Sequence, residues 1–185
     1  MENKRFKMFI GILVIVTLVG ISGFYIFNQL NKDNFFEEYI PEQEISDEQF
    51  RTTNVKLYFK EVNSNNLKAE SKNIDAKDLI SNPYITLVNL LIQGPTSLDL
   101  QATIPEGTTV NSTSLIGDTL VLDLSESFIN NHPGTVEAEN ATIYSIVNTL
   151  TELTEVNSVR ILINGVENCA FPDNMINFSN PFVRK

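Results

Sequence analysis

The chain has 185 residues, of which 13 are Lys or Arg and 23 are Asp or Glu, so its formal net charge at pH 7 is −10. This acidity excludes a typical nucleic-acid surface, because binding to phosphates needs a basic patch that releases counterions. This length predicts one folded domain with accessory segments, and a hydrophobic content of 42% is ordinary for a folded protein. The one cysteine, Cys169, allows neither an intramolecular disulfide nor a thiolate metal cluster. We expect it to be a small, partly buried hydrophobe, and we expect no metal or other cofactor.

The first predicted element is an uncharged stretch, Met8–Phe27. A helix of this length spans ~30 Å, the thickness of the hydrocarbon core of a bilayer. A basic flank, residues 1–7, precedes it, and acidic residues follow it at a distance. The positive-inside rule therefore predicts a membrane anchor over residues 8–28, with the N-terminus in the cytoplasm and the remainder outside the cell membrane.

A cleaved signal peptide is the alternative reading of this segment, with a small-residue site at Gly20-Ile21-Ser22. We favour a retained anchor, because apolar residues continue beyond that site to Phe27. No cysteine stands near the end of the apolar run to accept a lipid.

Residues 29–52 are acidic and show little apolar periodicity. This composition predicts a stalk that repels itself and an anionic lipid surface. A short amphipathic helix over residues 35–40, lying at the interface, is the alternative.

A half-buried strand is predicted where Val55, Leu57 and Phe59 alternate with polar residues. A turn over residues 63–66 and a weaker returning strand over residues 67–72 follow it. Asn82 and Pro83 then give the cap and first turn of a helix.

Two stops follow this helix. Gly94 can adopt the left-handed conformation that closes a helix, and Pro95 cannot continue one. Pro105-Glu106-Gly107 is a tight turn that leads into a strand over residues 108–116.

Gly117-Asp118 predicts a hairpin, with Leu120, Leu122 and Leu124 on one face of its second strand. A loop over residues 130–134, a helix over residues 137–153 and a last strand around residues 159–163 follow. The order of elements predicts an α+β fold over residues 53–185, in which two helices cover one face of a small mixed sheet. The helical positions Val147 and Leu150 are expected to pack against Leu120 and Leu122.

The inventory of catalytic residues is short. His132 is the only histidine, and a His-Pro-Gly loop is explained more simply as a turn; nothing in the pattern brings Cys169 to it. Glu137 and Glu139 suit the positive end of a helix. Asp123 and Glu126 could meet at a strand end, but a glycosidase also needs an aromatic sugar cleft, and the chain has no tryptophan. We therefore expect no catalytic residues.

The ordered segments "LVNLLIQGP", "ATIPEGTTV", "LVLDLSESF", "NTLTELTEVNSVRILING" and "INFSNPFVRK" resemble the GerMN domain of bacterial sporulation and germination proteins. The resemblance covers residues 55–185 and implies a fold related to ring-building modules. The positions that carry it as structural motif residues are Gly94, Pro95, Pro105, Gly107, Asp123, Thr149 and Gly165.

The resemblance also implies a non-enzymatic, extracytoplasmic assembly or scaffold protein that acts in sporulation or spore germination. Its expected partners are proteins of the sporulation envelope complex, or further copies of the same chain, in the space between two membranes. The chain departs from the family pattern in having one such domain on a peptide anchor. An ectodomain partner of a membrane signalling kinase, or a cell-wall hydrolase, remains the alternative.

Overall fold

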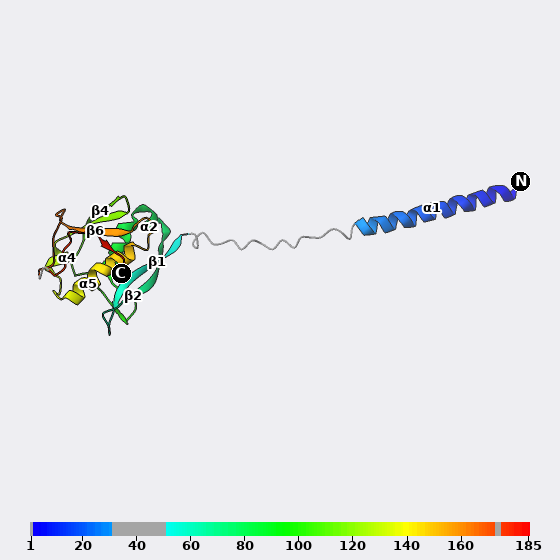
Figure 1. Ribbon diagram of the computed structural model, residues 1–185. Coiled ribbons are helices and arrows are strands. Elements are labelled where there is room, and N and C mark those ends of the chain that lie inside the picture. Colours follow the sequence, from blue (N-terminus) through cyan, green and yellow to red (C-terminus); the bar gives the residue numbers. More distant parts are fainter. Residues whose placement is uncertain (1, 31–50, 173–174) are drawn as a thin grey trace. The chain divides into compact units, whose positions relative to one another are not determined.

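A computed structural model describes residues 2–30, 51–172 and 175–185. The chain divides into two compact units, Met1–Glu44 and Ile45–Lys185. Figure 1 shows the long N-terminal helix and the folded domain. The predicted stalk, residues 29–52, and the alternative amphipathic helix within it fall almost entirely on residues 31–50, outside the described residues.

The N-terminal helix α1 (Glu2–Leu30) runs through the whole of the predicted anchor. Among the residues that the structure describes, no helix is long and apolar enough to cross a membrane. The side chains of residues 2, 4–10, 12–14 and 30 lie outside that description. Membrane anchoring therefore stays a prediction.

The domain begins with a three-stranded sheet in the order β2-β1-β3. β1 (Thr52–Glu61) and β2 (Leu67–Asp75) form a long antiparallel hairpin, which confirms both predicted strands and extends the second. β3 (Leu100–Gln101) pairs with the end of β1 only, at Lys60 and Glu61. This leaves most of one edge of β1 without a partner strand.

Two helices follow the hairpin. α2 (Ala76–Ser81) was not predicted; the side chain of Asp75 caps it by accepting a 2.8 Å hydrogen bond from the main-chain N–H of Lys77. α3 (Pro83–Gln93) begins at the predicted proline, although the side chain of its N-cap, Asn82, makes no capping bond.

The second sheet has four strands in the order β4-β5-β6-β7. β4 (Val110–Ile116) and β5 (Thr119–Leu124) form the predicted hairpin, and β6 (Ser158–Ile163) lies parallel to β5. β4 begins two residues later than expected. β6 is not the last strand, because β7 (Phe182–Val183) pairs with its first residues.

Between β5 and β6 the chain forms α4 (Ser127–Asn130), which was not predicted, and α5 (Val136–Leu150). Thr135 caps α5, since its side chain accepts a 3.2 Å hydrogen bond from the N–H of Ala138. α5 ends at Leu150, three residues before the expected end, where the chain enters a turn.

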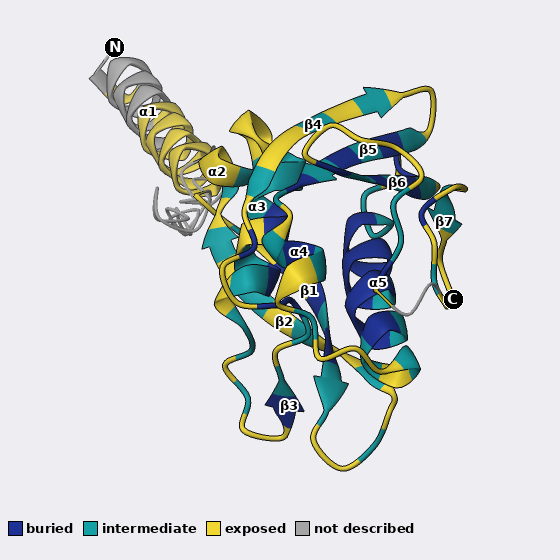
Figure 2. Cartoon of the chain, turned by 90° about the vertical axis from the view of Figure 1, so that its left-hand side faces the viewer, coloured by how far each residue is buried: buried dark blue, intermediate teal, exposed yellow. Residues whose placement is uncertain are grey.

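The expectation of one sheet with two helices on one face is wrong. α3 and α5 contact each other, and both contact β1 of the first sheet; α3 also contacts β4 and α5 also contacts β6 of the second. Figure 2 shows α5 as the most buried element of the domain. Val147, Leu150, Leu120 and Leu122 are all fully buried in one core cluster. The helices therefore share a core with both sheets.

Candidate interaction site

The structure brings two of the predicted motif residues together. Asp123 Oδ1 on β5 accepts a 2.8 Å hydrogen bond from the N–H of Gly165, just beyond β6. Asn164 and Gly165 have φ of 49° and 75°, the paired positive values of the tight turn that returns the chain from Ile163 to Val166. Asp123 thus holds a turn in place.

A third motif residue, Thr149 on α5, contacts strand β1 of the first sheet. The N–H of Tyr58 on β1 donates a 3.0 Å hydrogen bond to Thr149 Oγ1, and the carbonyl of Tyr58 accepts one of 2.6 Å from Ser145 Oγ. Ser145 and Thr149 are four residues apart and therefore lie on the same face of α5. Their hydroxyls form hydrogen bonds with the main-chain N–H and carbonyl of Tyr58, at a position on the edge of β1 that β3 does not reach. The helix thus covers a strand edge that would otherwise be open.

The glycine and proline motif residues end α3 and lead into β4. Gly94 has φ 84° and ψ 177°, so it is not left-handed helical as expected, but it adopts a positive φ that favours glycine all the same. Pro95 follows it and cannot continue the helix. Gly107 has φ 80°, and the carbonyl of Pro105 accepts both the N–H and the hydroxyl of Thr108 at 3.3 and 2.7 Å, which confirms the tight turn.

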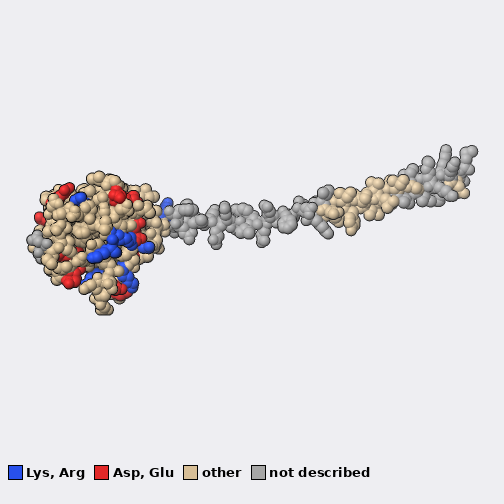
Figure 3. Space-filling model, in the orientation of Figure 1, with Lys and Arg blue, Asp and Glu red and all other residues tan. Residues whose placement is uncertain are grey.

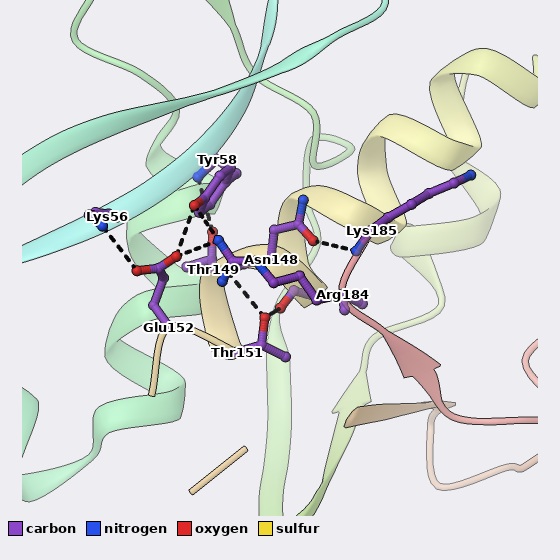
Figure 4. Close-up of polar contacts among 9 residues, drawn as sticks. Lys56, Tyr58, Asn148, Thr149, Thr151, Glu152, Arg184 and Lys185 are labelled. Atoms are coloured by element: carbon purple, nitrogen blue, oxygen red, sulfur yellow. Dashed lines mark hydrogen bonds and ion pairs between the residues drawn. The ribbon is translucent and has the colours of Figure 1, made fainter. Parts of the chain in front are cut away.

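A polar cluster, defined here as Tyr58, Glu152 and Arg184 with Lys56 at its margin, lies outside the end of α5 (Figure 4). The Tyr58 hydroxyl donates a 2.8 Å hydrogen bond to Glu152 Oε1, and Arg184 donates to both. Lys56 Nζ lies 3.4 Å from Glu152 Oε2. Residues far apart in the chain thus meet around one carboxylate.

The electrostatics of this cluster favour a neutral Tyr58 and an ionised Glu152. Burial raises the pKa of Tyr58, and the hydrogen bond to Glu152 raises it further. Burial would also raise the pKa of Glu152, but hydrogen bonds from Arg184 and Tyr58 outweigh it and lower that pKa below its usual value. Glu152 therefore remains an acceptor at neutral pH.

The residues after β7 bind to the last turns of α5. Arg184 donates to the carbonyl of Asn148 at 3.5 Å, and the main-chain N–H of Lys185 donates to Asn148 Oδ1 at 3.3 Å. A cation at this end also complements the negative end of the helix. Lys185 Nζ lies 4.7 Å from the centre of the Tyr144 ring.

A pocket of about 650 Å³ lies beside the C-terminal residues that follow β7. Its lining includes Tyr58, Asn140, Tyr144, Asn148 and Lys185, together with residues of the turn between β1 and β2. Figure 3 shows Lys and Arg side chains gathered on the face of the domain where Figure 1 marks the C-terminal end, with Asp and Glu spread around them. This surface offers tyrosine, amide and cationic groups for contact.

The side chains considered for catalysis have structural partners. Nε2 of His132 lies 3.0 Å from Thr142 Oγ1, and its Nδ1 accepts the N–H of Gly134 at 3.2 Å. Because the Thr142 hydroxyl donates to the carbonyl of Thr103, the proton of the imidazole lies on Nε2. The ring packs 4.5 Å from that of Phe171. His132 therefore fastens a loop to the core.

Cys169 packs against the core as a partly buried side chain, as predicted. Glu137 and Glu139 both lie in the first turn of α5, as expected for the positive end of a helix. Glu137 is exposed, whereas Glu139 is fully buried. Within residues 2–30, 51–172 and 175–185, no group of three or more His, Cys, Asp or Glu side chains is placed to hold a metal ion.

Sequence reasoning missed the polar cluster. Tyr58 and Lys56 alternate with core positions of β1 and therefore look like ordinary outward-facing residues. Glu152 lies in the expected helix but in an actual turn, and Arg184 lies 32 residues further along the chain. The one available signal was the segment "INFSNPFVRK", which ends in two basic residues.

The fold and the site together define a small α+β domain whose motif residues hold strands, turns and helix ends in place. The chain belongs to the Germane family, described as sporulation and spore germination, whose model matches residues 56–169. This confirms the resemblance to GerMN proteins.

Solved structures show the same fold. The tandem GerMN domains of the sporulation protein GerM from Bacillus subtilis match with a TM-score of 0.60 and 22% identity, over 78% of this chain and 50% of that one. The first GerMN domain of the same protein matches with a TM-score of 0.60 and 23% identity, over 71% of this chain and 98% of that one. The chain thus spans half the length of the tandem protein. No match was found among curated proteins.

Proposed function

We propose that this chain is a membrane-anchored, extracytoplasmic assembly protein of sporulation or spore germination, and that it works by contact and not by catalysis. The observation that supports this most directly is the use of its motif side chains. Asp123 and Thr149 bind main-chain N–H groups of Gly165 and Tyr58. In this chain, these two motif side chains thus hold the framework of the domain together.

The polar cluster and the adjoining pocket supply the surface for contact. Arg184 is 42% exposed and Lys56 is 56% exposed, so both cations remain accessible while they contact Glu152. Interface hot spots are enriched in tyrosine and arginine. An acidic or amide-rich segment of another envelope protein suits this combination.

Anchoring determines where such contacts occur. The uncharged stretch Met8–Phe27 lies within the continuous helix α1, and basic residues precede it. A domain tethered outside the membrane meets partners in the same gap at high effective concentration, so weak contacts suffice. The same domain in dilute solution can be monomeric.

Deleting the gene in a spore former and scoring spore yield and germination tests the role. We expect a defect that the full chain restores. Normal spores from the deletion strain, together with altered envelope signalling in growing cells, would instead favour a partner of a signalling kinase.

Neutral replacements test the non-enzymatic part. A chain that carries Asp123→Asn, Glu126→Gln and Cys169→Ser has side chains of similar shape at these three positions, but it lacks their two carboxylates and the thiol. We expect it to restore spore formation as the unchanged chain does. Loss of function at normal protein level would point to catalysis.

A further inference from the structure

In the described part of the domain, the outer edge of β4 is a long strand edge that has neither a partner strand nor a charged residue. β4 ends its sheet and pairs only with β5. Its seven residues, Val110–Ile116, include no charged residue and no proline. Charges and prolines are the usual devices that keep an edge strand from pairing with another chain.

The other edges are protected. β2 is long, but it carries Lys68, Glu70, Lys72 and Asp75. The side chain of Glu70 also accepts the N–H groups of Thr96 and Ser97 at 3.1 and 2.7 Å. β3 and β7 have two residues each. β4 is therefore the long edge at which the strand itself presents no charged side chain to a second copy.

The hydrogen-bonding pattern identifies which main-chain groups face outward from β4. The carbonyl of Leu124 accepts the N–H of Asn164 from the β6 side. Because successive residues of a strand turn their groups to alternate sides, Leu122 and Leu120 also face β6. Their partners on β4, Thr113 and Leu115, therefore direct their N–H and C=O groups away from the sheet.

We propose that two copies of this chain pair through β4, antiparallel and about a two-fold axis at Ser114. The proposal rests on the assembly role above and names its self-association surface. Thr113 and Leu115 of one copy then exchange hydrogen bonds with Leu115 and Thr113 of the other. This register uses the regular part of β4, beyond the irregularity between Val110 and Ser112.

Side chains on the exposed face fit this register. Ser114 of one copy lies opposite Ser114 of the other, at a pair where the Cα atoms approach to about 4.5 Å. Ile116, which is 66% exposed, lies opposite Ser112 and loses part of its contact with water. The two-fold arrangement closes on itself and produces a dimer with a continuous eight-stranded sheet.

Cysteine crosslinking of the full chain in its membranes tests the pairing. In a Cys169→Ser background, Ser114→Cys places one thiol at the proposed axis. Ser71→Cys is the matched control, an exposed serine on the edge strand β2. Under mild oxidation we expect a disulfide-linked dimer several-fold more abundant for Ser114→Cys than for Ser71→Cys. Equal yields, or a higher yield at Ser71, would overturn the proposal.

A charge variant gives an independent readout on the chain with its native cysteine. Ser114→Glu sets two carboxylates opposite each other across the axis, where like charges destabilise pairing. We expect it to shift the detergent-solubilised full chain from dimer to monomer, whereas Ser71→Glu leaves the dimer intact. Unfolding temperatures within a degree or two of each other show that both variants fold. A monomer in the unchanged chain that also gives no Ser114→Cys crosslink rejects β4 pairing, yet a sporulation defect on deletion would leave the assembly role standing.

Discussion

The N–H of Tyr58 on β1 donates a 3.0 Å hydrogen bond to the hydroxyl of Thr149 on α5, 91 residues further along the chain. This bond joins the first sheet to the central helix at the edge of β1 that faces away from β2, at a position that β3 does not reach. Thr149 is fully buried, so its oxygen is protected from competing water.

Replacing Thr149 by valine keeps the size of the side chain but removes the acceptor. The partly buried N–H of Tyr58 then loses its acceptor, and the free energy of unfolding should fall by about 1–3 kcal/mol. Urea unfolding of the domain measures this change. Thr154→Val, in an exposed turn, should alter it by less than about 0.5 kcal/mol. Equal effects of the two variants would show that the bond to Tyr58 contributes nothing.

Asp123 should tolerate an amide but not a methyl group. Asp123→Asn retains an oxygen for the N–H of Gly165, whereas Asp123→Ala loses it and should cost about 1–2 kcal/mol. Thermal unfolding distinguishes the two. Glu126→Ala, an exposed carboxylate nearby, is the control. If Asn costs as much as Ala, the charge and not the hydrogen bond holds the turn.

Leu150→Ala tests the shared core. The side chain is fully buried at the end of α5, so its truncation should lower the free energy of unfolding by about 2–5 kcal/mol. Leu98 is 97% exposed, and Leu98→Ala should have little effect. Similar values for both variants would place α5 away from the core.

The polar cluster predicts a pH dependence. The pKa of Glu152 is lower in the folded state than its ordinary value near 4.5, so its ionised form stabilises the fold. That contribution is present above about pH 4.5 and is lost as the pH falls through the folded-state pKa. Because Arg184 is 42% exposed, solvent screening limits the effect to about 1 kcal/mol or less.

Glu152→Gln should therefore flatten the fall in stability between pH 5 and pH 3, as measured by thermal unfolding across that range. Glu106→Gln, an exposed residue in the turn before β4, provides the matched control. A pH profile for Glu152→Gln that coincides with that of the unchanged chain would remove Glu152 from the acid response.

Topology can be measured with a reporter enzyme. Alkaline phosphatase fused after Arg51 should be active in intact cells, because the basic flank before Met8 predicts export of everything beyond the span. The same fusion without residues 1–30 should be inactive. An inactive full fusion at normal protein level would contradict the predicted orientation.

Local chemistry was enough to predict most elements of the domain. Alternation along β1, the Asn-Pro start of α3 and the two-residue turn at Gly117 each act within a few residues, so they can be read from the sequence. The ordered motif set by itself also indicated the family, which the family model confirms. The short elements α2, α4 and β7 were not predicted, because elements of two to six residues are too short to show a hydrophobic periodicity.

Tertiary structure alone decided how the strands are distributed and which side chains meet. β1 lies in a different sheet from β4, β5 and β6. This separation depends on main-chain pairing between distant segments, and the periodicity of side chains along one strand does not indicate which strand it pairs with. The folded path of the chain likewise decides two sets of polar contacts. Ser145 and Thr149 bind the main chain of β1, and Arg184 contacts Glu152. The hydrophobic pattern of the sequence thus determined which faces are buried, and the fold determined which polar groups those buried faces bring together.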